Sequence, residues 1–231
     1  MADRVKPRRR YDSPRRREQA EATRRQILRA AQDLFERDGY AATSMATVAS
    51  AAGVSLKTIY VAFETKSGLL RALWHLLLRG DQDSVPVGEQ PWFRDVLQEP
   101  DPQRQLRLNM RNSRTVKVRA GALMEVIRDA APADAQIRAL WARIQTEFYD
   151  NQRAVVQTLQ DKSALKAGLD VDSATDILWS LNHPSLYALL TRERGWPPER
   201  YEEWLADLLC ERLLDDGTGE RLTTHRDGPP P

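Results

Sequence analysis

The sequence predicts an all-α protein with a small N-terminal helix-turn-helix domain and a larger helical C-terminal domain. Three observations support this prediction. Apolar residues recur at the three-and-four spacing of a helix face along most of the 231-residue chain. The sequence contains no strand-like alternation of any length and no internal repeat. Two short helical patterns, separated by a tight turn, lie between residues 39 and 66, which is the arrangement of a helix-turn-helix unit.

The two short helices are expected at about residues 45–52 and 56–63. Ser44 and Ser55 each precede one of them, where a hydroxyl can accept a hydrogen bond from the free N–H groups of a helix start. Gly53 stands where the first helix must stop, because glycine tolerates the left-handed conformation that such a stop often needs. Two helices this short cannot bury their own faces, so a supporting helix is required.

The other elements follow from periodicity and from helix-breaking residues. Asp101 precedes a proline and is expected to cap the helix that begins there. Pro184 lies inside an apolar helical pattern and should kink it, because proline removes a backbone donor. The expected helices span about residues 18–38, 66–79, 102–130 with an interruption near 118–121, 132–165, 171–194 and 199–214, with a short helical turn at 92–97.

Basic and acidic residues are distributed unevenly along the chain. Residues 1–66 carry 14 Lys and Arg against 8 Asp and Glu, whereas the remainder carries 21 against 25. A basic N-terminal part favours a polyanionic partner for that part alone. Residues 1–17 are rich in arginine and poor in large apolar side chains, so they are expected to be disordered, as a solubilising tail or as an arm that reaches DNA phosphates or the minor groove.

Composition also limits the compartment. No apolar run approaches the ~18 residues of a membrane span, and the basic N-terminus lacks the apolar segment of a secretory signal. Cys210 is the single cysteine, which excludes an internal disulfide framework and suits a cytoplasmic protein. Its leucine-rich surroundings favour a core residue over a reactive thiol.

Residues 20–70 resemble the N-terminal domain of TetR-type transcriptional regulators. The resemblance rests on landmarks at fixed offsets: Gly39-Tyr40, Thr43-Ser44, Val48-Ala49, Gly53-Val54-Ser55, Thr58-Ile59-Tyr60, Phe63, Lys66 and Leu69-Leu70. It implies four parts: a disordered basic arm (1–17), a helix-turn-helix DNA-binding domain (18–66), a helical effector-binding and dimerisation domain (67–216) and a disordered tail (217–231). The C-terminal part matches the family only in size and helicity.

The resemblance also assigns roles to individual residues. Contacts to DNA phosphates are implied for Thr43, Ser44, Thr58, Tyr60 and Lys66. Contacts to bases are implied for Ser55, Leu56, Lys57 and Val61. Hydroxyl and ammonium groups supply most backbone contacts, and a lysine at a helix start is otherwise badly placed against the helix dipole. Packing alone for Tyr60 and a solvated charge for Lys66 remain alternatives.

Two departures from the family pattern bear on DNA binding. Val61-Ala62 replaces an aromatic or histidine pair that is frequent in the family, and Ala46 and Thr47 leave the first short helix without a long base-reading side chain. Specificity is therefore expected to depend on Lys57 and on the arginine arm.

The C-terminal part is expected to dimerise and to receive a small-molecule effector. A single helix-turn-helix unit (the reader, residues 39–66) binds DNA weakly. The resemblance implies a homodimer through helices 171–194 and 199–214, although the leucines of these helices could instead pack inside one monomer. His183 is expected to be a capped core or interface residue rather than an effector contact. Candidate effector-lining residues, each also a plausible core residue, are Trp74, Met110, Met124, Trp141, Phe148 and Tyr149.

The expected function is a ligand-responsive repressor that binds a palindromic operator in double-stranded DNA and is released by a small apolar or amphipathic effector. An effector-independent activator or architectural DNA-binding protein is the alternative. An enzyme is not expected, because the three histidines are far apart in the sequence and neither metal-ligand spacing nor a phosphate-cradling glycine loop is present. No catalytic residue, metal or cofactor is therefore assigned, and no membrane partner is expected.

Overall fold

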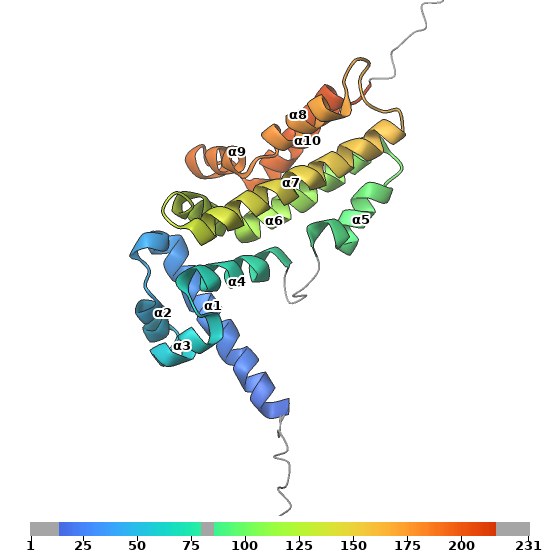
Figure 1. Cartoon of the computed structure of the whole chain (residues 1–231). Coiled ribbons are helices and arrows are strands. Elements are labelled where there is room, and N and C mark those ends of the chain that lie inside the picture. The colour runs from blue at the N-terminus through green and yellow to red at the C-terminus, as the bar shows by residue number, and fades with distance from the viewer. Residues whose placement is uncertain (1–13, 80–85, 216–231) are drawn as a thin grey trace, which may run out of the picture. The chain divides into compact units, whose positions relative to one another are not determined.

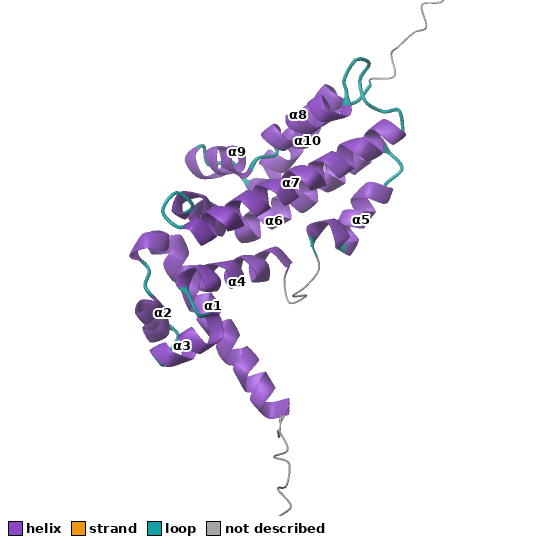
Figure 2. Ribbon diagram, viewed as in Figure 1, coloured by secondary structure: helices purple, strands orange, loops and turns teal. Residues whose placement is uncertain are grey.

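The computed structural model describes residues 14–79 and 86–215. Within these residues the secondary structure is helical, apart from one isolated β-bridge between Leu165 and Leu214. Figure 2 shows the helices and the short loops that join them. In this part of the chain no single helix is long and apolar enough to cross a membrane. Only a pair of short helices joined by a 113° bend passes that length and composition test, and only when counted together.

The chain divides into two compact units that do not follow the predicted domain boundary. The first unit comprises residues up to 83 together with 122–142, and the second comprises 84–121 and the residues from 143 onward. The predicted boundary lay between residues 66 and 67. The helix that begins at Lys66 belongs to the first unit because its leucines pack into that unit's core.

Four of the described helices lie wholly in the first unit, and Figure 1 shows them together. They are α1 (Pro14–Ala42), α2 (Met45–Ala51), α3 (Leu56–Phe63) and α4 (Lys66–Arg79). The predicted helices at 45–52, 56–63 and 66–79 are confirmed to within one residue. Fully buried apolar side chains from all four helices form the core: Ile27, Ala31, Phe35, Val48, Ile59, Leu69, Leu70 and Leu73.

Helix α1 begins earlier than predicted. Residues 14–17, expected to belong to a disordered arm, form its first turn, and residues 1–13 of that arm lie outside the described part of the chain. Proline favours the first position of a helix, where its missing N–H would have no partner. At the other end Gly39, with φ 80° and ψ 168°, interrupts the helix where the sequence predicted a stop.

The second unit contains most of the remaining helices, and α6 and α7 contribute residues to both units. The elements are η1 (Val87–Glu89), α5 (Pro91–Gln98), α6 (Pro102–Ala130), α7 (Ala135–Asp161), α8 (Val171–Leu181), α9 (Pro184–Ala188), the π-helix η2 (Leu189–Glu193) and α10 (Pro198–Leu213). Asp101 caps α6 as predicted, its Oδ1 accepting a hydrogen bond from the N–H of Arg104 at 2.7 Å. Cys210 is half-buried against the core of this unit.

Two predicted boundaries in α6 and α7 are wrong. Helix α6 is continuous through residues 118–121, because Ala120 and Leu123 are fully buried and a helical glycine costs only about 1 kcal/mol. Helix α7 spans 135–161 rather than 132–165. Asp134 caps its start by accepting from the N–H of Ile137 at 3.2 Å, and Ser163, with a φ of 54°, lies just beyond its end.

The predicted helix 171–194 is broken rather than kinked. Helix α8 ends at Leu181, and Pro184 is the first residue of α9. His183 caps α9, because its Nδ1 accepts from the N–H of Ser185 at 3.2 Å. The buried side chain of Asn182 anchors the break, and Gly195, with a φ of 67°, lies just after η2.

Candidate functional site

Helix α3 has one buried face and one exposed apolar face. Ile59 and Phe63 are buried, at 0% and 6% exposure, whereas Leu56, Tyr60 and Val61 are exposed by 43%, 48% and 77%. Three of the five exposed large hydrophobic side chains in the described residues belong to this eight-residue helix. Such a concentration of exposed apolar side chains marks a binding surface.

The helix starts of α2 and α3 are built alike. The Oγ of Ser44 accepts from the N–H of Thr47 at 3.0 Å, and the Oγ of Ser55 accepts from the N–H of Thr58 at 3.1 Å. In each pair the two hydroxyl groups also lie 2.7 Å apart. Each start therefore presents hydroxyls beside free helix N–H groups, which is suitable chemistry for contact with phosphate oxygens.

Two side chains of α1 hold the other ends of these helices. Nε2 of Gln26 donates to the carbonyl of Ala52 at 2.8 Å, and Nη1 of Arg24 donates to the carbonyl of Ala62 at 3.1 Å. These contacts satisfy carbonyls that a helix end leaves without partners. The sequence analysis missed both residues, because nothing in the sequence shows which polar side chain of a long helix meets a distant helix end.

Lys66 begins α4 as predicted, and its ammonium makes hydrogen bonds inside the first unit. Its ammonium donates to the carbonyls of Tyr40 at 2.8 Å and Thr43 at 3.0 Å, and Nζ lies 4.2 Å from the centre of the Tyr40 ring. Partial burial lowers the pKa of this ammonium. With two of its three donors directed at carbonyls near the start of α2, Lys66 acts as an internal brace, and its contact with a DNA phosphate remains a prediction.

The same brace includes Tyr40 and Asp134. Oη of Tyr40 donates to Oδ2 of Asp134 at 2.8 Å, and both residues belong to the first unit. Burial, followed by the hydrogen bond to the carboxylate, raises the pKa of the Tyr40 hydroxyl above its ordinary value. Lys66, Tyr40 and Asp134 therefore fix the turn that precedes α2.

Thr43 is wrongly assigned. Its side chain is 2% exposed, and its hydroxyl donates to the carbonyl of Gly39 at 2.8 Å. A buried hydroxyl with an internal partner does not reach a phosphate. Thr58 is half-buried, and the other predicted DNA contacts are exposed: Ser44, Ser55, Leu56, Lys57, Tyr60 and Val61. Their contacts with DNA remain predictions.

The predicted effector-lining residues are divided between the two units. Trp74, Met124 and Trp141 belong to the first unit, and Met110, Phe148 and Tyr149 belong to the second. Three of these side chains are almost completely buried, which agrees with the alternative that they are core residues: Trp74, Met110 and Met124. None of the six lines the pocket at the break between α8 and α9 or the pocket at the turn between α3 and α4.

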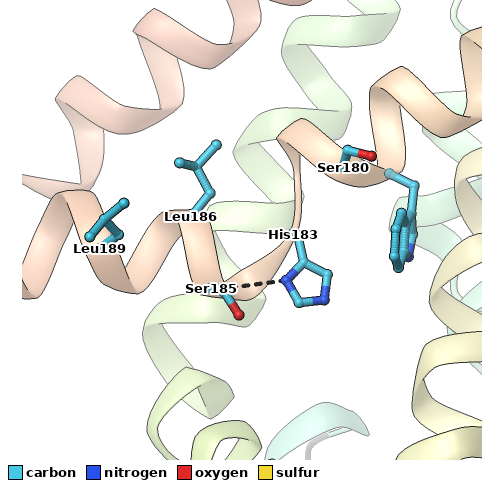
Figure 3. A pocket seen from close by; sticks show the side chains of 6 residues that line it. Ser180, His183, Ser185, Leu186 and Leu189 are labelled. Atoms are coloured by element: carbon cyan, nitrogen blue, oxygen red, sulfur yellow. Dashed lines mark hydrogen bonds between the residues drawn. The ribbon is translucent and has the colours of Figure 1, made fainter.

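One of those pockets lies at the break between α8 and α9, with a volume of about 420 Å³. Figure 3 shows His183 at the bend, joined by a hydrogen bond to Ser185, with Leu186 and Leu189 farther along α9 and η2. The centre of the His183 ring lies 5.3 Å from the centre of the Trp179 ring and 6.4 Å from the centre of the Phe148 ring.

His183 has a neighbour on each side of its ring. Its Nδ1 accepts from the N–H of Ser185 at 3.2 Å, and its Nε2 lies 3.1 Å from the side-chain amide nitrogen of Gln145. His183 is thus a helix cap with a partner on α7, which agrees with the expectation of a capped residue.

The helices expected to form a dimer interface contain fewer available leucines than predicted. Leu178, Leu205 and Leu209 are fully buried within the second unit, so they belong to the monomer core. Leu189 is 45% exposed, and other large apolar residues of these helices are partly buried: Ile177, Leu181, Leu186, Leu190, Trp204 and Leu208. The partly buried set, rather than the whole apolar pattern, is the part of these helices available to a partner.

Comparison with known proteins gives matches of two kinds. Residues 27–73 match the family described as bacterial regulatory proteins, tetR family. A curated relative, the HTH-type transcriptional regulator AcrR of Shigella flexneri, is 41% identical over 59 residues, which cover 26% of this chain and 27% of AcrR. The chain thus spans about a quarter of that relative's length.

Solved structures extend the likeness to the whole chain as a fold. NalD, the secondary repressor of the MexAB-OprM multidrug efflux pump in Pseudomonas aeruginosa, has a TM-score of 0.65 at 22% identity over 86% of this chain and 99% of NalD. SmeT, a repressor of the Stenotrophomonas maltophilia efflux pump SmeDEF solved in complex with triclosan, has a TM-score of 0.66 at 20% identity over 90% of this chain and 100% of that chain.

Proposed function

We propose that the chain is a TetR-type regulator, a ligand-responsive repressor that binds a palindromic operator as a dimer. Its residues 27–73 match the tetR family of bacterial regulatory proteins, which supports the proposal. The matched family is one of regulatory proteins, which favours DNA binding over catalysis. The observation that carries the proposal is the exposed face of α3, where apolar side chains stand beside Lys57 on a helix whose opposite face is buried.

The chemistry of that face fits the major groove of DNA. Lys57 donates to guanine O6 and N7, and an apolar side chain such as Val61 contacts a thymine methyl group. The capped starts of α2 and α3 supply hydroxyl and N–H donors for the flanking phosphates. Both helix ends are held from α1, so the exposed face is presented in a fixed orientation.

A dimer is part of the proposal because one reader offers few base contacts. Specific binding by helix-turn-helix proteins uses two half-sites about one helical turn, roughly 34–36 Å, apart. The partly buried apolar residues of α8, α9, η2 and α10 supply the surface on which a second copy would pack.

The proposed effector is a small apolar or amphipathic molecule. The complex of SmeT with triclosan supports this class, since SmeT has the same fold. In the proposed mechanism the effector binds the C-terminal part and shifts the population of conformers through α4, which begins at Lys66 beside the reader. DNA release then follows from a changed separation of the two readers.

Selection of binding sites from a random double-stranded DNA library with the purified full chain tests the proposal. We expect enrichment of an inverted repeat. On the enriched site, Val61→Asp should weaken binding about tenfold or more, because a carboxylate replaces an apolar contact with a base and is repelled by the DNA phosphates. Val118→Asp is the matched control, since Val118 is 57% exposed on α6, outside the reader.

Three results would contradict the proposal. Enrichment of no motif, with strongly salt-dependent binding, indicates an architectural protein instead. Equal loss of binding in Val61→Asp and Val118→Asp places the DNA surface away from α3. Binding of the enriched site by a monomer in light scattering removes the dimer from the proposal.

A further inference from the structure

A second pocket lies in the first unit, at the turn between α3 and α4, where α1 also contributes a wall. Its volume is about 530 Å³, and two arginines and a histidine line it: Arg24 from α1, and Arg71 and His75 from α4. Glu64, in the turn itself, is the acidic residue of the lining. None of these four residues was assigned a role by the sequence.

Arg24 is held in place on one side of the pocket. Its Nη1 donates to the carbonyl of Ala62 at 3.1 Å, and its guanidinium carbon lies 4.4 Å from the centre of the Phe63 ring. A guanidinium carries five N–H donors in a planar fork, so one such bond leaves several donors for another acceptor. Stacking fixes the plane of the fork, which lowers the entropy lost when an anion binds.

Arg71 and His75 approach from α4. Gly68, Arg71, Ala72 and His75 all line the pocket, at the spacing that places residues on one face of a helix. The side chain of Arg71 is exposed, so its charge is accessible from solvent. Two guanidinium groups from separate helices therefore line a single polar concavity.

The turn between the two helices has a strained and tightly packed geometry. Glu64 has φ 59° and ψ −50°, a conformation that side chains other than glycine rarely adopt, and the N–H of Thr65 donates to the carbonyl of Phe63 at 2.6 Å. A Cβ added at Gly68 would lie 2.4 Å from that same carbonyl oxygen. Backbone strain of this kind is typical of binding and switch sites.

We propose that this pocket, with Arg24 and Arg71 as its ligands, binds a phosphate-type oxyanion. Two guanidinium groups match the geometry of phosphate oxygens through paired N–H bonds, and they outnumber the one carboxylate of the lining. The anion is a backbone phosphate of bound DNA or a phosphate group of a free small molecule. The first source rests on the proposed function, and the second does not.

The proposal accounts for two features that the reader alone does not explain. With Lys66 and Thr43 directed inward, the predicted phosphate contacts are reduced, and Arg24 and Arg71 supply cationic ones. The pocket also includes the last residues of α3 and the first turn of α4. An occupied pocket therefore stabilises the strained turn between the reader and the helix that follows it.

The test uses the full chain and inorganic phosphate as the probe. Phosphate is titrated at constant ionic strength against chloride, and binding is followed by NMR shifts of the backbone amides of Glu64 and Gly68. Arg71→Gln should weaken phosphate binding tenfold or more, because it removes one guanidinium without disturbing the stacked Arg24. Arg29→Gln, an exposed arginine of α1 outside the pocket, should leave binding unchanged. Glu64→Gln should tighten binding, because it removes the opposing carboxylate.

A DNA arm distinguishes the two sources of phosphate. The slope of log affinity against log salt concentration should fall by about 0.9 in Arg71→Gln, and by less in Arg29→Gln, if the ligand is a DNA phosphate. Loss of phosphate binding with an unchanged slope indicates a free small molecule. If the chain binds no DNA, the proposed function fails while the phosphate titration still tests the pocket. Equal phosphate binding by both variants, together with equal salt slopes, overturns the proposal.

Discussion

At the scale of single residues, the direction of a long side chain determines its role. Lys66 stands at the start of α4, but its ammonium is directed at the carbonyls of Tyr40 and Thr43 and at the Tyr40 ring, all of which precede α2. Lys117 is another such case. It is 4% exposed in the second unit, and its ammonium donates to Oδ1 of Asn182 at 2.6 Å. Both lysines are used inside the fold.

Replacing Lys66 should lower stability without changing the charge contacts made with DNA. Lys66→Met leaves two carbonyls without a charged donor, and hydrogen bonds to charged groups contribute roughly 1.5–3 kcal/mol. We expect a reduced melting temperature and an unchanged slope of DNA affinity against salt. A reduced slope with full stability would identify Lys66 as a phosphate contact.

Lys117 should make the stability of the second unit depend on pH. Burial lowers the pKa of its ammonium to about 7, and besides Asn182 it faces the hydroxyl of Tyr201 at 3.3 Å and the rings of Tyr201 and Tyr187. Because the unfolded chain keeps this proton up to the ordinary pKa of 10.5, the unfolded state binds more protons between these two values. Stability therefore rises with pH above about 7, and the full cost of burying the charge is present below it.

The difference between the wild type and Lys117→Met isolates this contribution. Its slope should approach 1.4 kcal/mol per pH unit between about pH 7.5 and 9, in denaturant unfolding. Lys57→Met, which alters an exposed lysine, is the control and should give a difference independent of pH. If the difference in unfolding free energy between the wild type and Lys117→Met did not change with pH, Lys117 would keep its proton in the folded state over this range.

At the scale of elements, the junctions between helices are fixed by specific backbone conformations and capping interactions. The α3–α4 turn combines a residue of positive φ with a close approach of Gly68 to a carbonyl. The α8–α9 break is fixed by a buried asparagine and a histidine cap. Helix α6, in contrast, runs through Gly121 without any bend that its sequence suggested.

Two glycine substitutions should have opposite effects on stability. In Gly68→Ala the new methyl group meets the Phe63 carbonyl oxygen at 2.4 Å, so the turn must shift, at a cost of roughly 1–3 kcal/mol. In Gly121→Ala the methyl group meets nothing within 4 Å, and alanine is favoured in a helix by about 0.5–1 kcal/mol. Thermal unfolding checks both, and stabilisation by Gly68→Ala would show that the turn is not tightly packed.

At the scale of the whole molecule, the proposed regulation requires two copies whose readers bind DNA together. Leu189 is the exposed large hydrophobic residue of the helices proposed for the interface. It also lines the pocket at the α8–α9 break, together with Leu186 and Trp179. A second copy packed on this surface would remove these side chains from water.

Leu189→Glu should shift the chain from dimer to monomer, because a carboxylate buried in an apolar interface without a partner costs several kcal/mol. Light scattering coupled to size exclusion measures the change, and affinity for the selected operator should fall with it. Val118→Glu is the control, an exposed hydrophobic residue outside these helices. A Leu189→Glu protein that remains dimeric would place the interface elsewhere.

The sequence by itself determined the local structure of the reader. Helix periodicity, Ser44, Ser55 and Gly39 act over a few residues, so the bounds of α2, α3 and α4 and the exposed face of α3 followed from them. The excess of basic residues among residues 1–66 predicted a polyanionic partner.

Only the tertiary structure decided which side chains remain available. Thr43 and Lys66 turned inward because carbonyls of the preceding turn lay within reach, and Arg24 met the end of α3 from 38 residues away. Likewise Leu178, Leu205 and Leu209 filled their own core. Hydrogen bonding and burial depend on partners distant in sequence, whereas propensity and capping depend on neighbours. The sequence therefore located the reader, and the fold selected the residues that can act in it.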